Sequence, residues 1–189
     1  MPSLLVTGGA PGADAAWARA ALAAGMAVEL KSFHGHGAHA QAGVRVTCVP
    51  PQELALARPA LCAAAAKLGK RPPAPMSYAH KLLARNLHVG RDALAMYALA
   101  HVDGSAGLGV AGGTGWACQL FVDARPRSPL YVYDLDSARW LAHDGTRLTP
   151  VDLVPHPSTY STWAGVGARD AGEAGERAVA ALMASSSAW

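Results

Sequence analysis

The sequence predicts an α/β fold in which a mainly parallel sheet lies between layers of helices. Twice along the chain, an apolar run suited to a strand leads into a glycine-rich turn and then into a helical pattern. The two turns are Gly8–Asp14 and Gly112–Gly115. The 189 residues are 51% hydrophobic and only 15% charged, which is the composition of a globular chain with a substantial core. Strand–helix–strand units of this kind build a Rossmann-like three-layer sandwich.

The first unit begins with the apolar run Leu4–Thr7, which predicts a buried strand. A helix is predicted over Asp14–Ala24, because small and aromatic residues recur there on one helical face, and Gly25 is expected to end it. Two further strands are predicted over Ala27–Phe33 and Val44–Val49. The order strand, helix, strand is that of a parallel sheet.

The middle of the chain is predicted to alternate helices with strands. Pro59 is expected to interrupt a helical region over Gln52–Leu68, and Ser77 is an expected helix N-cap. A glycine-rich stretch, Gly104–Gly115, precedes the helix that is predicted over Trp116–Ala124. The other elements predicted here are a loop over Arg71–Pro75, a helix over Tyr78–Val89, a strand over Ala93–His101, a helix over Trp116–Ala124 and a strand over Pro129–Tyr133.

The C-terminal part carries weaker patterns. Asp144-Gly145 is a turn dipeptide and predicts a hairpin over Arg139–Leu148. The segment Gly165–Gly175 carries little information and is interpreted as flexible, ahead of a last helix over Glu176–Met183. The sequence therefore predicts a Rossmann-like domain over residues 1–150 and a partly flexible C-terminal extension over residues 151–189.

Charge and cysteine content limit the partners and the location. The formal net charge is only +3 and most basic residues are scattered, so nucleic-acid binding is not expected. Three cysteines without paired spacing indicate reduced, mostly buried thiols, which favours a reducing, cytoplasmic location. No apolar stretch reaches about 18 residues without charge and no basic leader precedes the first strand, so neither a membrane span nor a signal peptide is expected.

Both glycine-rich turns have the chemistry of a phosphate-binding loop. Glycine lets the backbone turn tightly and approach a ligand, and the free N–H groups and dipole at a helix start attract an anion. For either turn alone, the alternative is a simple strand–helix connection with Asp14 as a cap. Two such turns gather at the carboxyl ends of the strands and predict a shared crevice. The predicted binding residues are Gly8, Gly9, Gly12, Ala13 and Asp14 in the first turn and Gly112, Gly113, Thr114 and Gly115 in the second.

These motifs resemble those of the SLOG superfamily, a Rossmann-like group that includes LOG-like ("lysine decarboxylase-like") phosphoribohydrolases and DprA-like DNA-processing proteins. Gly8–Asp14 is similar to that group's first turn, Leu83–Asn86 to its Arg–Asn helix, and Asp92–Tyr97 to the start of its fourth strand. Ala111–Gln119 lies where LOG enzymes carry Pro-Gly-Gly-X-Gly-Thr-X-X-Glu. The resemblance covers roughly residues 3–134. It implies a nucleotide site on a SLOG-like domain and, because this family commonly forms dimers, a homodimer.

The resemblance also implies roles for further side chains. Arg85 would face the pocket and pair with a phosphate, and Asn86 would hydrogen-bond a ribose or the neighbouring loop; a surface charge is the alternative for Arg85. Trp116 would either stack on a base or pack in the core. Gln119 stands where LOG enzymes carry the glutamate implicated in breaking the N-glycosidic bond, and an amide cannot act as a general base. Hydrolase activity would then need another carboxylate. The candidates are Asp14, Asp103 and Asp134.

Three histidines, His34, His36 and His39, lie in the glycine-rich loop after the second predicted strand. Converging imidazoles bind zinc or nickel, but no pairing with further ligands is evident, so neither a metal nor another cofactor is expected. The loop is predicted instead to border the crevice, where His34 or His36 would contact a phosphate or ribose. A plain exposed loop is the alternative.

Three functions compete on these observations. A binding module, such as a sensor for a nucleotide or an ADP-ribose-like signal, needs only the two turns. A nucleotide N-glycosidase or phosphoribohydrolase needs a replacement for the missing glutamate. A DNA-associated role is disfavoured by the weak positive charge. The sequence therefore favours binding of a nucleotide-like small molecule over catalysis.

Overall fold

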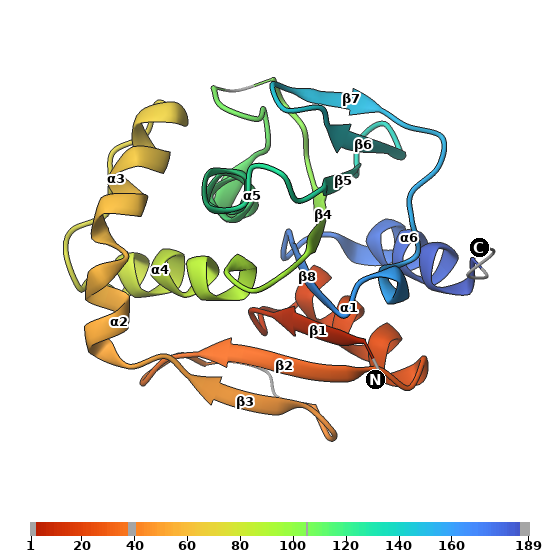
Figure 1. Ribbon diagram of the computed structural model, residues 1–189, viewed down its shortest axis with the longest axis horizontal. Coiled ribbons are helices and arrows are strands. Elements are labelled where there is room, and N and C mark those ends of the chain that lie inside the picture. Colours follow the sequence, from red (N-terminus) through yellow and green to blue (C-terminus); the bar gives the residue numbers. More distant parts are fainter. Residues whose placement is uncertain (1–2, 38–40, 105, 186–189) are drawn as a thin grey trace.

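One sheet runs through the whole molecule. The computed structural model describes residues 3–37, 41–104 and 106–185, which form eight strands and six α-helices. The strands are β1 (Leu4–Thr7), β2 (Ala27–Ser32), β3 (Arg45–Cys48), β4 (Ala95–Ala100), β5 (Leu130–Asp134), β6 (Arg139–His143), β7 (Leu148–Pro150) and β8 (Thr162–Gly167). They lie in the order β3-β2-β1-β8-β4-β5-β6-β7 (Figure 1). Pairing is parallel from β3 to β5, and β6 and β7 add an antiparallel edge.

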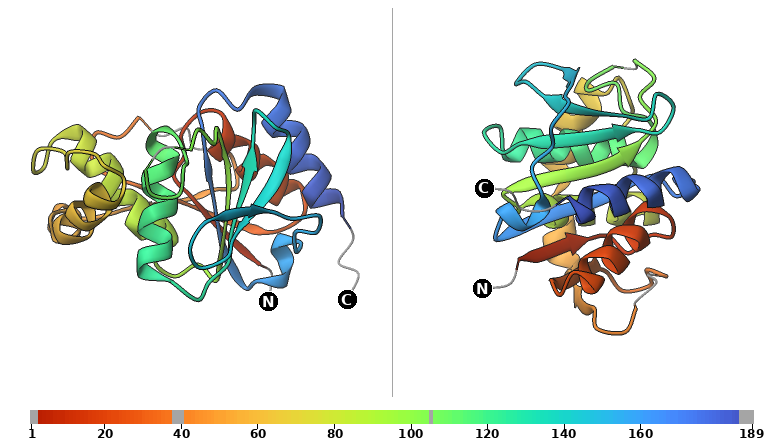
Figure 2. Two further views of the ribbon diagram at one scale, coloured as in Figure 1. Left: turned by 90° about the horizontal axis from the view of Figure 1, so that it is seen from above. Right: turned by 90° about the vertical axis from the view of Figure 1, so that its right-hand side faces the viewer.

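Helices cover both faces of this sheet. They are α1 (Ala13–Ala23), α2 (Pro51–Leu56), α3 (Arg58–Lys67), α4 (Tyr78–Gly90), α5 (Gly112–Ala124) and α6 (Gly172–Ala184), and a short 3₁₀ turn spans Pro157–Thr159. Helices α1 and α6 pack together on one face, and α4 and α5 pack together on the other (Figure 2). Helix α2 packs on α4, and α3 packs on α5. The predicted α/β sandwich with a mainly parallel central sheet is thus confirmed.

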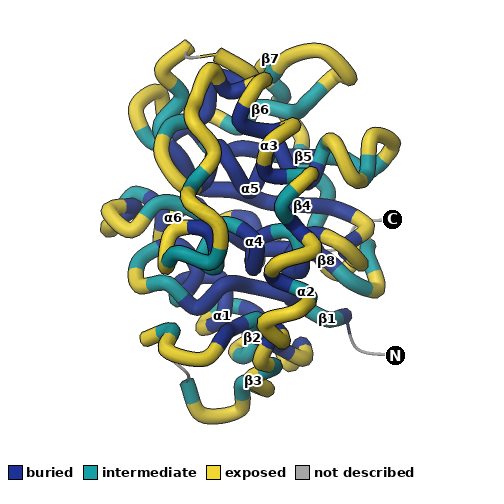
Figure 3. The backbone as a smooth tube through the Cα atoms, turned by 90° about the vertical axis from the view of Figure 1, so that its left-hand side faces the viewer, coloured by how far each residue is buried: buried dark blue, intermediate teal, exposed yellow. Residues whose placement is uncertain are grey.

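Burial falls from the middle of the sheet to its edges (Figure 3). Strand β4 is buried along its whole length, whereas β3 and β7 at the two edges contain no buried residue. A strand that is apolar at every position indicates a sheet covered on both faces. The sequence over Ala93–His101 has this character, and its prediction as a central strand is confirmed.

Several local signals in the sequence are also confirmed. Ser77 caps α4, where its Oγ accepts the N–H of His80 at 3.1 Å. Pro59 lies in the first turn of α3, where its missing N–H has no intrahelical partner to lose, so the helical region divides at Ala57. The Asp144-Gly145 turn joins β6 to β7 as the predicted hairpin.

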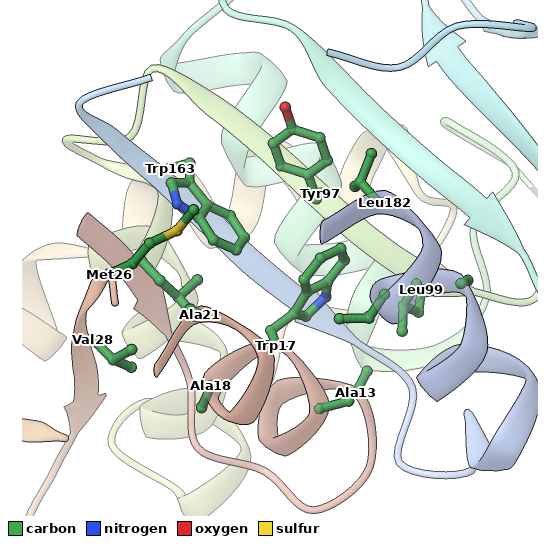
Figure 4. Packing of buried hydrophobic residues seen from close by; sticks show 14 of the residues in the cluster. Ala13, Trp17, Ala18, Ala21, Met26, Val28, Tyr97, Leu99, Trp163 and Leu182 are labelled. Atoms are coloured by element: carbon green, nitrogen blue, oxygen red, sulfur yellow. The ribbon is translucent and has the colours of Figure 1, made fainter. Parts of the chain in front are cut away.

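Three aromatic rings form the centre of the core between α1, α6 and the sheet (Figure 4). Trp17 of α1 meets Trp163 of β8 edge to face with 5.5 Å between ring centres. Tyr97 of β4 lies 6.0 Å from Trp17 and 5.6 Å from Trp163, and all three side chains are fully buried. The Trp17 indole N–H also donates to the Val166 carbonyl at 3.2 Å. This packing fixes α1 against the C-terminal end of β8.

The C-terminal part of the chain completes the middle of the sheet, which the sequence did not predict. Strand β8 lies between β1 and β4 and pairs in parallel with both, so a boundary at residue 150 would separate a central strand from its neighbours. The segment Gly165–Gly175 is not a flexible loop but contains the end of β8 and the start of α6. A Cβ at Gly165 would lie 2.8 Å from Cγ of Trp17, and one at Gly167 would lie 2.5 Å from Cβ of Ala13. These glycines therefore allow α1 to pack closely on the strand.

Two further predictions need correction. Gly112–Gly115 forms the first turn of α5 rather than a turn ahead of it, because the N–H of Gly115 already donates to the carbonyl of Ala111 at 3.1 Å. The cysteines are not mostly buried: Cys48 on the edge strand β3 and Cys62 on the outer helix α3 are exposed, and only Cys118 is buried. In the part of the chain that the structure describes, no helix has the length and apolar character that crossing a membrane requires.

Candidate functional site

A pocket of about 290 Å³ opens at the carboxyl ends of the central strands. The connection from β1 through α1 to β2 runs toward one edge of the sheet, and the connection from β4 through α5 to β5 runs toward the other edge. The direction of the connections therefore reverses between β1 and β4. Ligands of open α/β sheets bind at such a reversal. Four segments line the pocket: the first glycine turn, the middle of α4, the first turn of α5 and the chain that leaves β8. The lining residues are Ala10, Asp14, Leu82, Leu83, Arg85, Asn86, Gly113, Thr114, Ala117, Val166, Gly167, Ala168 and Arg169.

The first glycine turn leaves room for two other chain segments. A Cβ at Gly8 would overlap the guanidinium of Arg85, which therefore lies directly against the backbone of the turn. Gly12 has a φ of +83°, and a Cβ there would overlap the backbone of Arg169. The turn is thus shaped to receive an arginine from α4 and the exit of β8, and Gly9 packs in turn against Leu30.

Arg85 is a buried cation that has no hydrogen-bond or ion-pair partner among the described residues. Its side chain lines the pocket although the residue is only 4% exposed. Within residues 3–37, 41–104 and 106–185, the guanidinium forms no ion pair and no hydrogen bond, and its Nε is buried without a partner. Burial lowers the pKa of Arg85 and nearby Asp14 raises it in part. Because guanidinium keeps its proton in proteins, this side chain brings an uncompensated positive charge to the pocket.

Asp14 lines the same pocket, but its oxygens are already engaged. Oδ2 accepts the N–H of Ala10 and Oδ1 accepts the N–H of Gly167, both at 3.1 Å. Burial raises the pKa of Asp14, while Arg85 and the backbone N–H donors lower it. The carboxylate therefore ties the first turn to the end of β8. It does not cap α1, whose N-cap is Gly12 and has no side-chain hydrogen bond.

The second glycine turn contributes a helix N-terminus. Gly113 and Thr114 line the pocket, and no side chain caps α5 at Ala111. The first N–H groups of a helix have no intrahelical partner and carry the positive end of its dipole. The two glycine turns therefore do meet at one pocket, as the sequence predicts, with Arg85 between them.

Alanine substitutions at Gly113 and Gly115 are expected to change the free energy of unfolding by different amounts, because only Gly113 has open space around its Cβ position. A Cβ at Gly113 has no atom within 4 Å, so Gly113→Ala should change the free energy of unfolding by less than about 1 kcal/mol. A Cβ at Gly115 would overlap the backbone carbonyl of Val110, so Gly115→Ala should cost about 1–3 kcal/mol or more. Urea unfolding of both variants checks this. Equal losses would contradict the assignment of Gly113 to an open position.

Several predicted site residues lie elsewhere. Trp116 is buried in the cluster between α3, α4 and α5, so it packs in the core and offers no face to a base at this pocket. Gln119 is buried and donates to Asp123 at 2.9 Å, away from the pocket. Asp134 accepts the N–H of Val102 after β4 at 3.2 Å, and N–H and hydroxyl hydrogen bonds from the turn after β5, including the Ser137 hydroxyl at 2.5 Å. His34 is exposed and does not line the pocket.

Other predicted residues do not line the pocket. Ala13 is fully buried against β8, and Gly8, Gly9, Gly12, Gly112 and Gly115 are absent from the lining surface. His39 lies outside the described residues. Among the residues that are described, no three His, Cys, Asp or Glu side chains are arranged so that they could hold a metal ion.

The sequence missed the contribution of the chain after β8. Residues Val166–Arg169 form one wall of the pocket, and the exposed Arg169 adds a second positive charge at its rim. Arg169 lies close enough to Arg85 to lower the pKa of that side chain. The available signal was a short run without charged residues, Trp163–Ala168, that ends at an arginine.

No family model, curated protein or solved structure matches this chain. The resemblance to the SLOG superfamily therefore stays a prediction, and the functional argument rests on the pocket itself.

Proposed function

We propose that the pocket binds a nucleotide or a nucleotide-derived, ADP-ribose-like ligand through its phosphate, and that the protein acts as a sensor or binding protein. The observation that carries the proposal is the buried guanidinium of Arg85, which lies between two glycine-rich turns and has no hydrogen bond or ion pair to any described residue. A buried charge without a partner opposes folding. We therefore infer that an anionic ligand from solution pairs with this guanidinium. Guanidinium matches the geometry of phosphate oxygens.

The charge around the pocket favours an anion. Arg85 and Arg169 bring two positive charges, and the uncapped start of α5 adds the positive end of a helix dipole. The carboxylate on the lining surface is that of Asp14, which is hydrogen-bonded to the backbone. The excess of positive charge suits a phosphate. The volume of about 290 Å³ lies at the lower end of the usual range for small-molecule sites and fits a mononucleotide-sized group.

The same arrangement supports binding over N-glycosidic hydrolysis. Of the three candidate carboxylates, Asp103 and Asp134 do not line the pocket, and neither does Gln119 at the position of the missing glutamate. Asp14 does, but each of its oxygens already accepts a backbone N–H group, which assigns the carboxylate a structural role in tying the first turn to the end of β8. We therefore expect no free base after incubation with nucleoside monophosphates. Release of base by the wild-type protein and not by Asp14→Asn would instead favour the hydrolase.

Calorimetric titration with AMP and ADP-ribose tests the proposal. Arg85→Ala should weaken binding about 10- to 100-fold, because charge-assisted hydrogen bonds to phosphate are lost. Arg177→Ala is the matched control: Arg177 lies on α6, paired with Glu173 at 3.2 Å outside the pocket, and its removal should leave the affinity unchanged. Equal binding by the Arg85→Ala and wild-type proteins, or binding of neither ligand by the wild type, would overturn the proposal.

A further inference from the structure

A small group of aromatic side chains, Phe33, His36 and Tyr78, lies where β2 ends and α4 begins; we call it the aromatic shelf. The ring of His36 stacks on that of Phe33 with 4.8 Å between centres and 18° between planes. Tyr78 meets Phe33 at 5.7 Å and 64°. Phe33 is buried and anchors the shelf in the core between α2, α3 and α4. His36 is partly exposed and Tyr78 is 54% exposed, so both present ring surface to solvent.

The shelf is adjacent to the pocket on the side of α4. Tyr78 precedes Leu82 by four residues and Arg85 by seven, a spacing that places all three on one helical face, and Leu82 and Arg85 both line the pocket. His36, at the other end of the shelf, is near the same group, because Arg85 and Arg169 both contribute, after burial, to lowering its pKa.

The chemistry of the shelf suits a flat, uncharged ring. Burial, together with Arg85 and Arg169, lowers the pKa of His36 to about 4, so its imidazole is neutral at pH 7. Nδ1 of His36 is 3.2 Å from the Ser32 hydroxyl, which leaves Nε2 for another partner. Among the residues that the structure describes, no atom lies within 4 Å of a Cβ position at either glycine that flanks His36, Gly35 or Gly37. Aromatic surfaces of this kind stack on nucleobases whatever the base.

We infer that the aromatic shelf is a nucleobase subsite, so that the pocket takes base-bearing nucleotides in preference to sugar phosphates. The inference rests on the proposed function, since Arg85 has to hold the phosphate for the base to reach the shelf. It also replaces the predicted stacking residue Trp116, which is buried in the core, with Tyr78 and His36.

Titration with AMP and with ribose 5-phosphate tests the subsite, because the two ligands share a phosphate and a ribose and differ in the base. The wild-type protein should bind AMP at least about 10-fold more tightly. Tyr78→Ala and His36→Ala should each reduce that ratio and leave the affinity for ribose 5-phosphate unchanged. Tyr78→Phe keeps the ring and should keep the ratio. Tyr78 is more than half exposed, so its variants should fold, and circular dichroism checks that they do.

The outcomes separate the two proposals. Equal affinity of the wild type for AMP and ribose 5-phosphate would overturn the base subsite and leave phosphate binding standing. So would an equal loss of affinity for both ligands in Tyr78→Ala. Binding of neither ligand would overturn the subsite together with the proposed function.

Discussion

Replacing Trp163 with alanine is expected to lower the free energy of unfolding by about 3–5 kcal/mol. Trp163 is fully buried in β8 and packs on both Trp17 and Tyr97, so its removal opens a cavity between α1 and the sheet. This loss of free energy weakens β8, which joins the two halves of the sheet because it pairs with β1 on one side and with β4 on the other. Urea unfolding measures it.

Trp140→Ala is the matched control for that prediction. Trp140 lies on β6, near the antiparallel edge, is only partly buried and packs on Tyr133 at 5.3 Å, so its loss should cost less. A chain that ends at residue 150 lacks β8 and α6 and is expected to show no cooperative unfolding transition. A cooperative transition in that chain would show that residues 151–189 are dispensable, and equal losses in the two tryptophan variants would contradict the larger contribution assigned to Trp163.

The first half of the fold was predictable because its signals are local. A strand that enters a glycine turn, a serine N-cap and a proline at a helix start each act within a few residues. The predicted helix over Asp14–Ala24 and the capping role of Ser77 follow from such signals. Strand β8 was not predicted, because its signals depend on contacts with residues that are distant in the sequence. Gly165 and Gly167 are dictated by the approach of Trp17 and Ala13, which lie about 150 positions earlier in the chain.

The candidate site also contains residues that local motifs predict and residues that only the fold brings to the pocket. Arg85 and the two glycine turns could be named from motifs, but Arg169 reaches the pocket only through the placement of β8. Helix phase explains the misplaced Gln119. At about 100° per residue, Gln119 lies roughly 140° around α5 from Thr114, which lines the pocket. Trp116 and Gln119 are three residues apart and share the stripe that faces α3 and Lys67.

The side chains of Asp14 and Arg85 are expected to have interdependent effects on the free energy of unfolding. Asp14→Ala should lower the free energy of unfolding by about 3–5 kcal/mol. Two backbone N–H groups, those of Ala10 and Gly167, lose their acceptor. Arg85 loses the carboxylate whose charge opposes the effect of burial on its pKa. The buried guanidinium then loses this nearby opposing charge, although the two groups form no direct ion pair.

Arg85→Met should behave differently, since it removes a buried charge and keeps much of the packing. We expect it to change the free energy of unfolding by less than about 1 kcal/mol or to raise it, although the same variant should lose phosphate binding. In the double variant Asp14→Ala/Arg85→Met, the loss should be smaller than for Asp14→Ala alone by about 1–3 kcal/mol. Urea unfolding of the four proteins closes the cycle. Strictly additive losses would mean that the two side chains do not interact, and a large loss in Arg85→Met would assign Arg85 to the support of the fold instead of to a ligand.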